Sequence, residues 1–233
     1  MESVPAFVSV VFMITTFVTV GIFLSAVRVT AERSAFGKTV LFVVPFWMLF
    51  QFAMARGGFF ADTTAFPPRL FLFGLLPAVA LIALAFVAAR EGFVASLPLA
   101  VITIVHVIRI PVELTLAWLA EARVVPELIT YHGTNFDILS GLTAPIAFYF
   151  AFTRSDWSRP VLIAWNLLAL GLVLNVVITA ILCAPSPIQL LAFEQPNIAV
   201  LHSPYIWLPT VVVPIVIFCH LAALYQLLSS RRA

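Results

Sequence analysis

Long apolar runs recur along the whole chain and limit its fold more than any other feature. About 20 apolar residues cross a hydrocarbon core of about 30 Å as a helix. Apolar side chains make up 63% of the chain and charged ones 9%, so no stretch remains for a water-soluble domain. The pattern predicts an all-α membrane protein, one domain over 1–233, with seven transmembrane helices at about 5–28, 39–56, 69–89, 95–121, 136–153, 160–183 and 206–228.

The basic residues are distributed unequally between the two sets of connections. Positively charged side chains are enriched in the cytoplasmic loops of membrane proteins. If the N-terminus is outside, the inner connections and the C-terminal tail hold Arg28, Arg33, Lys38, Arg90, Arg154, Arg159, Arg231 and Arg232, and the outer ones hold Arg56, Arg69 and Arg123. This asymmetry predicts an outer N-terminus and an inner C-terminus.

Three outer connections are long and rich in proline, amides and aromatic residues. They read "RGGFFADTTAFPPR", "EARVVPELITYHGTNFD" and "APSPIQLLAFEQPNIAVLHSPYIW". Long connections of this kind are more often binding loops or lids than plain linkers. Asn135 or Asp137 could cap the fifth helix. Capping does not explain the whole polar group, which we expect at a binding surface: Glu127, His132, Asn135, Asp137, Glu194, Gln195 and Asn197.

The fourth predicted helix contains "TIVHVIRIPVELTL", with three ionisable residues in an apolar run. At 100° per residue, His106, Arg109 and Glu113 fall on one polar stripe. Ionisable groups at bilayer depth are costly, so they face the bundle interior or a wet cavity. Pro111 leaves the carbonyl of Val107 without its helical donor and predicts a kink. Either Arg109 and Glu113 pair to tie helices together, or the stripe forms one wall of a ligand cavity.

A second deep histidine, His220, is predicted at a depth similar to that of His106. Two imidazoles on different helices could ligate haem b on both faces, or a divalent metal completed by Glu113 or water. Each could equally be a hydrogen-bonded polar residue of the core. Asn175, near the middle of its helix, could line the same cavity, although amides between membrane helices usually serve packing.

Three segments carry a resemblance to a known family. "HVIRIPVE", "NFDILSGLTAP" and "FEQPNIAVL", together with His220 in the last helix, are similar to stretches in an uncharacterised family of bacterial seven-helix integral membrane proteins. The resemblance implies a bacterial inner-membrane location. It brings no activity, cofactor or catalytic residue with it.

The sequence therefore predicts an outward-facing polar cavity that binds a small polar or anionic ligand, with Arg109 holding the anion and Glu113 as its counter-ion in the empty state. Such a protein would be a sensor, a binder or a carrier. One alternative is a redox protein with haem b or a metal at His106 and His220, and another is a membrane-interface enzyme acting on a lipid. The expected partners are the lipid bilayer and a small molecule, not nucleic acid.

Overall fold

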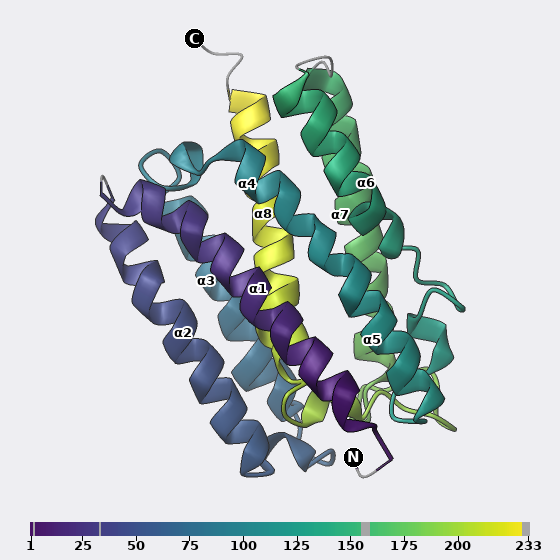
Figure 1. Cartoon of the computed structure of the whole chain (residues 1–233). Coiled ribbons are helices and arrows are strands. Elements are labelled where there is room, and N and C mark those ends of the chain that lie inside the picture. Colours follow the sequence, from purple (N-terminus) through teal and green to yellow (C-terminus); the bar gives the residue numbers. More distant parts are fainter. Residues whose placement is uncertain (2, 33, 155–158, 230–233) are drawn as a thin grey trace.

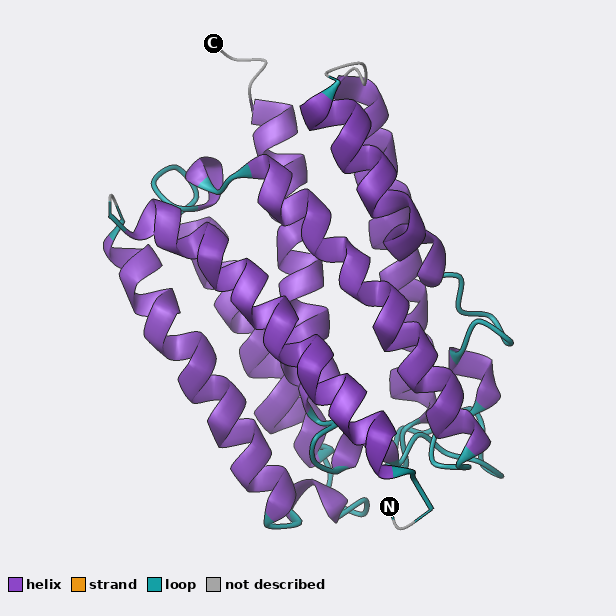
Figure 2. Cartoon of the chain, in the orientation of Figure 1, coloured by secondary structure: helices purple, strands orange, loops and turns teal. Residues whose placement is uncertain are grey.

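The computed structural model describes residues 1, 3–32, 34–154 and 159–229, and it forms a bundle of helices in which the described residues contain no strand (Figures 1 and 2). The helices are α1 (Ala6–Ala31), α2 (Ala35–Arg56), α3 (Leu76–Ala88), α4 (Leu99–Ile104), α5 (Arg109–Glu121), α6 (Ile138–Phe148), α7 (Arg159–Cys183) and α8 (Val213–Ser229). One turn of wider π-helix precedes α3 and α8, at Phe71–Leu75 and Leu208–Val212, and another follows α6 at Tyr149–Thr153. The prediction of an all-α chain is confirmed.

Six of the continuous helices are long and apolar enough to cross a membrane: Ala6–Ala31, Ala35–Arg56, Phe71–Ala88, Leu99–Glu121, Arg159–Cys183 and Leu208–Ser229. The seventh, Ile138–Thr153, is apolar but shorter. Their limits lie within a few residues of the seven predicted runs, because charged residues and Pro or Gly clusters end the helices where the apolar pattern also ends.

Two helices form the centre of the bundle. In the apolar window of Leu99–Glu121, which joins α4 and α5, 56% of the residues are buried, and in Leu208–Ser229 61% are buried. In α2 the same fraction is only 17%. α1 packs against both α2 and α5, while α7 packs on α8 and α6 lies along the α4–α5 segment (Figure 1). The polar stripe of the fourth predicted helix therefore lies in the interior.

The α4–α5 segment is irregular at the point that Pro111 predicts. Val105–Ile108 forms a tight 3₁₀ turn between the two α-helices. Proline has no N–H for the carbonyl one turn before it, and its ring crowds that turn, so the regular hydrogen-bond ladder is interrupted there. His106 lies in this turn and is fully buried.

Indole and amide side chains join α2 to the turns that precede α3 and α8. Trp47 on α2 donates to the carbonyl of Thr210 at 2.8 Å, and Trp207 donates to the carbonyl of Met48 at 2.8 Å. Gln51 donates from α2 to the carbonyl of Phe73 at 2.8 Å. Interhelical hydrogen bonds of this kind are worth roughly 0.6–2 kcal/mol each between membrane helices. They hold α2 beside α3 and α8.

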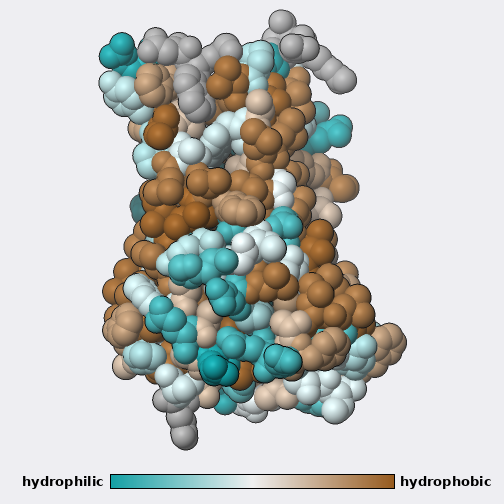
Figure 3. Space-filling model, turned by 90° about the vertical axis from the view of Figure 1, so that its right-hand side faces the viewer, coloured by the Kyte–Doolittle hydropathy of each residue, from teal (hydrophilic) through white to brown (hydrophobic). Residues whose placement is uncertain are grey.

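The three long connections lie at one end of the bundle, together with the N-terminus (Figure 1). We call this end, formed by residues 57–70, 122–137 and 184–207, the loop-rich end. Hydrophilic side chains gather over it in the lower part of Figure 3, whereas apolar side chains dominate the region above. The site described below lies where this end meets the interior of the bundle.

Candidate functional site

Arg109 and Asp137 form a buried ion pair between α5 and the start of α6. The Nε of Arg109 lies 3.2 Å from Oδ2 of Asp137, and both side chains are almost completely buried. The two terminal nitrogens of the guanidinium donate to the carbonyl of Ala169 on α7 at 3.3 Å. One guanidinium therefore connects three helices.

Glu113 has a different partner from the one expected. The sequence suggested that it pairs with Arg109 one turn away, but both of its carboxylate oxygens accept hydrogen bonds at 2.8 Å from Nδ2 of Asn135. The same amide nitrogen donates to the carbonyl of Ile129 at 3.0 Å. Asp137 provides the charge partner of Arg109 instead. The expected Arg109–Glu113 pair is therefore wrong for this structure, because the connection before α6 supplies closer partners to both residues.

Asn135 also arranges the start of α6. Its Oδ1 accepts the backbone N–H of Asp137 at 2.9 Å. Asp137 is the residue before the first helical position, and its side chain makes no capping hydrogen bond to the helix. Asn135 therefore shapes the turn that leads into α6, two residues before the N-cap position, and the expected side-chain cap at Asp137 does not form. This leaves the carboxylate of Asp137 free to face Arg109.

Gly141 allows α6 to lie close enough for these contacts. A Cβ added at Gly141 would lie 2.9 Å from Cγ1 of Ile110, 3.0 Å from its backbone nitrogen and 3.2 Å from Cβ of Arg109. Small residues permit such close approach between membrane helices. The glycine in "NFDILSGLTAP" therefore sets the distance between α6 and the segment that carries Arg109.

His106 and His220 lie next to this network and stack on each other. Their ring centroids are 3.7 Å apart with 11° between the planes. Nδ1 of His220 lies 2.9 Å from Oδ1 of Asn166, whose own amide nitrogen donates to the carbonyl of Leu162. Because that oxygen can only accept, Nδ1 of His220 carries the proton of this hydrogen bond. Trp165 contacts both imidazoles at ring distances of 5.7 and 5.8 Å.

This arrangement does not fit haem b between the two histidines. A haem with two axial histidines has one imidazole on each face, and each directs a nitrogen at the iron. Rings stacked face to face at 3.7 Å leave no space for a macrocycle between them. Among the residues that the structure describes, no group of three His, Cys, Asp or Glu side chains is placed to hold a metal ion. The pair was correctly expected at one depth, but its geometry is that of a packed contact.

A cavity of about 110 Å³ lies beside the ion pair, between α5, α7 and the π-helical turns that precede α3 and α8. Its walls are mainly apolar and include Val112, Leu116, Val173 and Val177. The sequence had suggested a polar cavity, so the character of the walls is a correction. A second cavity, between α1, α2, α3 and α8, is also apolar and contains none of the ionisable residues.

The polar residues that line the first cavity deep inside the bundle are Glu113, Asp137 and Asn197, and Thr63 and Ser186 line it at the loop-rich end. Glu113, Asp137 and Asn197 are buried. Asp62 and Arg69, which form an ion pair of half-buried side chains, also line it and come from the loop-rich end. Arg109 is not among the lining residues. The cavity therefore presents carboxyl groups to a ligand.

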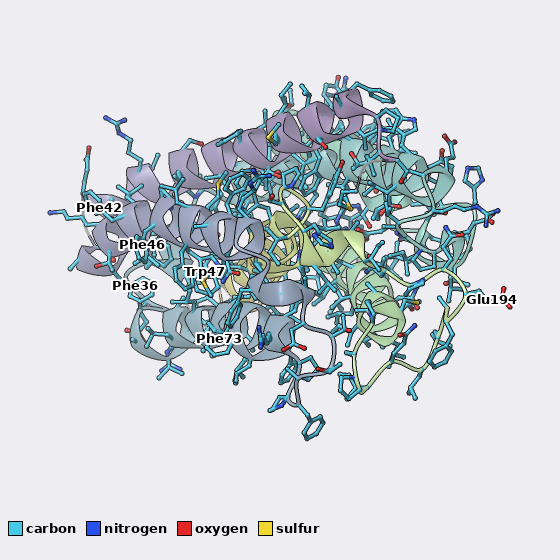
Figure 4. The ribbon with its side chains drawn as sticks, turned by 90° about the horizontal axis from the view of Figure 1, so that it is seen from below. Phe36, Phe42, Phe46, Trp47, Phe73 and Glu194 are labelled. Atoms are coloured by element: carbon cyan, nitrogen blue, oxygen red, sulfur yellow. The ribbon has the colours of Figure 1, made fainter. Side chains whose placement is uncertain are left out.

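The remaining predicted residues lie outside the cavity. Asn175 is exposed and donates to the carbonyl of Thr134 at 3.1 Å, so it fastens α7 to a connection. Gln195 donates to two carbonyls, those of Ala120 at 3.1 Å and Val125 at 2.6 Å, and so anchors its loop. Glu127, His132 and Glu194 are exposed, and Glu194 points away from the bundle at its edge (Figure 4). These three side chains do not form a roof over the cavity.

Two elements of the site were absent from the sequence-based set. Asn166 orients His220, and its position on an apolar helix gave no sign of a partner 54 residues away. The ion pair of Asp62 and Arg69 forms because the connection between α2 and α3 folds back and brings the two residues together. The Phe66–Pro67 peptide bond in this connection is cis. The only available signal was that both residues interrupt an otherwise apolar and proline-rich segment.

Comparison with known proteins gives one family match. No curated protein and no solved structure matches the chain. A family model described as "Domain of unknown function (DUF8737)" matches residues 67–228, which is more than half of the chain. The match runs from the connection before α3 to the end of α8 and includes the ion pair, the stacked histidines and most of the cavity. The chain belongs to the DUF8737 family.

Proposed function

We propose that this protein is a multi-pass protein of the bacterial inner membrane, with seven spans, its N-terminus outside and its C-terminus inside. Support comes from the six long apolar helices and from the excess of basic residues in the connections opposite the loop-rich end. The similarity of "HVIRIPVE", "NFDILSGLTAP" and "FEQPNIAVL" to bacterial membrane proteins agrees with this location. On this proposal, the loop-rich end faces the outside.

A topology experiment tests this proposal. Alkaline phosphatase is active only outside the cytoplasm, and green fluorescent protein fluoresces mainly inside it. We expect a C-terminal fusion to fluoresce in a bacterial host, and a phosphatase inserted between residues 189 and 190 to be active. An active C-terminal phosphatase fusion would contradict the proposed orientation.

We propose further that the protein binds a small molecule with an apolar body in the cavity beside Arg109 and Asp137, as a sensor, a binder or a carrier. The observation that carries this proposal is a cavity with apolar walls and buried carboxyl groups, reached from the loop-rich end. Concave, mostly apolar sites with a few fixed polar groups are typical of small-molecule sites. Their polar groups orient the ligand, and their apolar walls exclude water.

The role of Arg109 differs from the one expected at first. Its guanidinium already has Asp137 and the carbonyl of Ala169 as partners, and it does not line the cavity. It therefore serves to position Asp137 and α7, and among the described residues that line the cavity an anionic ligand meets no cation that lacks an acidic partner. An enzyme of the membrane interface is less well supported, because Glu127, His132 and Glu194 share no hydrogen bond or ion pair among the described residues.

Adjacent positions on α7 provide a matched test of binding. Val177 lines the cavity, whereas Ile178 is 57% exposed on the outer face of the same helix. We expect at least one of benzylamine, benzyl alcohol and benzoate, titrated into the detergent-purified protein by calorimetry, to bind the unchanged chain and the variant Ile178→Phe. Val177→Phe fills the cavity and should abolish this binding. Equal binding to the two variants, or no binding of any of the three compounds, would contradict the proposal.

A further inference from the structure

The unpaired polar atoms at the cavity are hydrogen-bond acceptors. Oδ1 of Asp137 and Oδ1 of Asn197 are both buried, and neither accepts a hydrogen bond of good geometry among the described residues, although the hydroxyl of Ser140 lies close to the carboxylate of Asp137. The exposed fractions of the two residues are 4% and 1%, and both line the cavity. Leaving a buried acceptor without a donor costs roughly 1–3 kcal/mol. A ligand that supplies donors at this point would remove that cost.

The orientation of Asn197 is determined by its contacts. Its Nδ2 donates to the carbonyl of Ala180 at 3.4 Å, and its backbone N–H donates to the carbonyl of Cys183 at 2.9 Å. Because the amide nitrogen is directed at α7, the amide oxygen is the atom left for a ligand. An amide oxygen only accepts hydrogen bonds, as an ionised carboxylate does.

The charges around the cavity do not balance when its carboxyl groups are ionised. Arg109 compensates Asp137, and Arg69 compensates Asp62. Glu113 receives hydrogen bonds from Asn135 but has no cation as a salt-bridge partner among the described residues. A buried charge without a counter-charge is strongly unfavourable. A single positive charge with several N–H donors would compensate an ionised Glu113 and supply the donors that the other oxygens lack.

We propose that the cavity binds a small primary amine in its ammonium form, with the ammonium group among Asp137, Asn197 and Glu113 and the apolar body against α5 and α7. An ammonium group has three donors and no acceptor, which matches the acceptor oxygens of Asp137, Asn197 and Glu113. This inference rests on the proposed function and names the class of its ligand. Because a closed cavity of about 150 Å³ accepts a benzene ring, and this cavity of about 110 Å³ is open toward the loop-rich end, benzylamine is about the largest free amine that it can take.

An aminolipid is a second source of the same ammonium chemistry. Its phosphate would lie next to the ammonium group and therefore close to the carboxylates, where like charges repel. The small volume of the cavity, about 110 Å³, also favours a free amine. We therefore expect vesicles that contain an ethanolamine phospholipid to compete weakly with benzylamine, by less than twofold in apparent affinity. Strong competition by those vesicles, but not by choline phospholipid vesicles, would overturn the assignment to a free amine.

Three probes with the same benzene ring test which polar group the cavity prefers. Benzylamine, benzyl alcohol and benzoate share one ring and differ in charge. In calorimetric titrations of the full chain in detergent, with a detergent-only blank, we expect benzylamine to bind at least tenfold more tightly than benzyl alcohol, and benzoate not to bind. Equal affinities for all three would overturn the ammonium site while leaving cavity binding intact. Failure of all three would instead contradict the proposed function.

Variants of single glutamate residues test which carboxyl group binds the ammonium group. Glu113→Gln should lower benzylamine affinity at least tenfold and leave that of benzyl alcohol unchanged, which also shows that the variant is folded. Glu127→Gln removes an exposed carboxylate at the same end of the molecule and should change neither affinity. If Glu113→Gln keeps full benzylamine affinity, or if Glu127→Gln lowers it equally, the ammonium site is not at Glu113.

Discussion

The close approach of α6 to α5 at Gly141 leads to a quantitative prediction. In Gly141→Ala, the new Cβ would lie 2.9 and 3.0 Å from Cγ1 and N of Ile110. The side-chain atom can rotate aside, but the backbone nitrogen cannot, so α6 must move outward by several tenths of an ångström. Overpacking of this kind costs typically about 1–3 kcal/mol. Because α6 carries Asp137 at its start, the displacement also lengthens the ion pair with Arg109.

A control for this substitution lies on α7. A Cβ added at Gly171 meets nothing within 4 Å, and an alanine in a helix is favoured over glycine by up to about 1 kcal/mol. Gly171→Ala should therefore be neutral or slightly stabilising. Gly141→Ala should be destabilised by about 0–2 kcal/mol relative to the unchanged chain, and by about 1–3 kcal/mol relative to Gly171→Ala, because the gain in helix propensity is the same in both variants.

The assay is reversible unfolding of the purified protein in mixed micelles with increasing dodecyl sulfate, followed by circular dichroism. The same samples report benzylamine affinity, which should fall for Gly141→Ala and remain unchanged for Gly171→Ala. If the two alanine variants unfold within about 0.5 kcal/mol of each other, a margin set by additivity of independent sites, the close helix contact does not control the position of α6.

Two further predictions concern the ion pairs. Arg109→Met leaves Asp137 buried without a counter-charge and should lower the free energy of unfolding by about 3–5 kcal/mol. The double variant Arg109→Met with Asp137→Leu should recover most of that loss. A double variant as unstable as the single one would contradict the pairing. At the mouth of the cavity, hydrogen bonds from Thr64 and the charge of Arg69 hold the pKa of Asp62 below its ordinary value of 3.8. The stability from this lowered pKa is present above pH 3.8 and is lost as the pH falls through the folded-state pKa, so the melting temperatures of the unchanged chain and Asp62→Asn should converge at low pH. A constant difference between them down to pH 2 would contradict this assignment.

The helices could be predicted from the sequence because their signal is local. Runs of about 20 apolar residues, ended by charge or by proline, locate each span without any knowledge of its neighbours. Pro111 gave the irregular turn in the same way, since its missing N–H acts within one turn. The helix Ile138–Thr153 is shorter than the others. An apolar run therefore predicts the position of a helix better than its length.

The partners within the site could not be predicted, because they depend on tertiary contacts. Helical spacing brings Glu113 within reach of Arg109, but it carries no information on Asp137, which reaches Arg109 only because Gly141 admits α6. The depth estimate for His106 and His220 was compatible with a stack, a haem or separate positions. The choice among them depends on the packing of α8 against the turn at His106, which periodicity does not encode.

The most direct test of amine binding in this cavity is a crystal structure of the full chain with 4-bromobenzylamine, whose bromine is located by anomalous scattering. We expect the bromine between α5 and α7 near Val177, and the nitrogen about 2.7–2.9 Å from Oδ1 of Asp137, the distance of a charge-assisted hydrogen bond. A bromine position outside the cavity, or an amine directed away from Glu113, Asp137 and Asn197, would contradict the account.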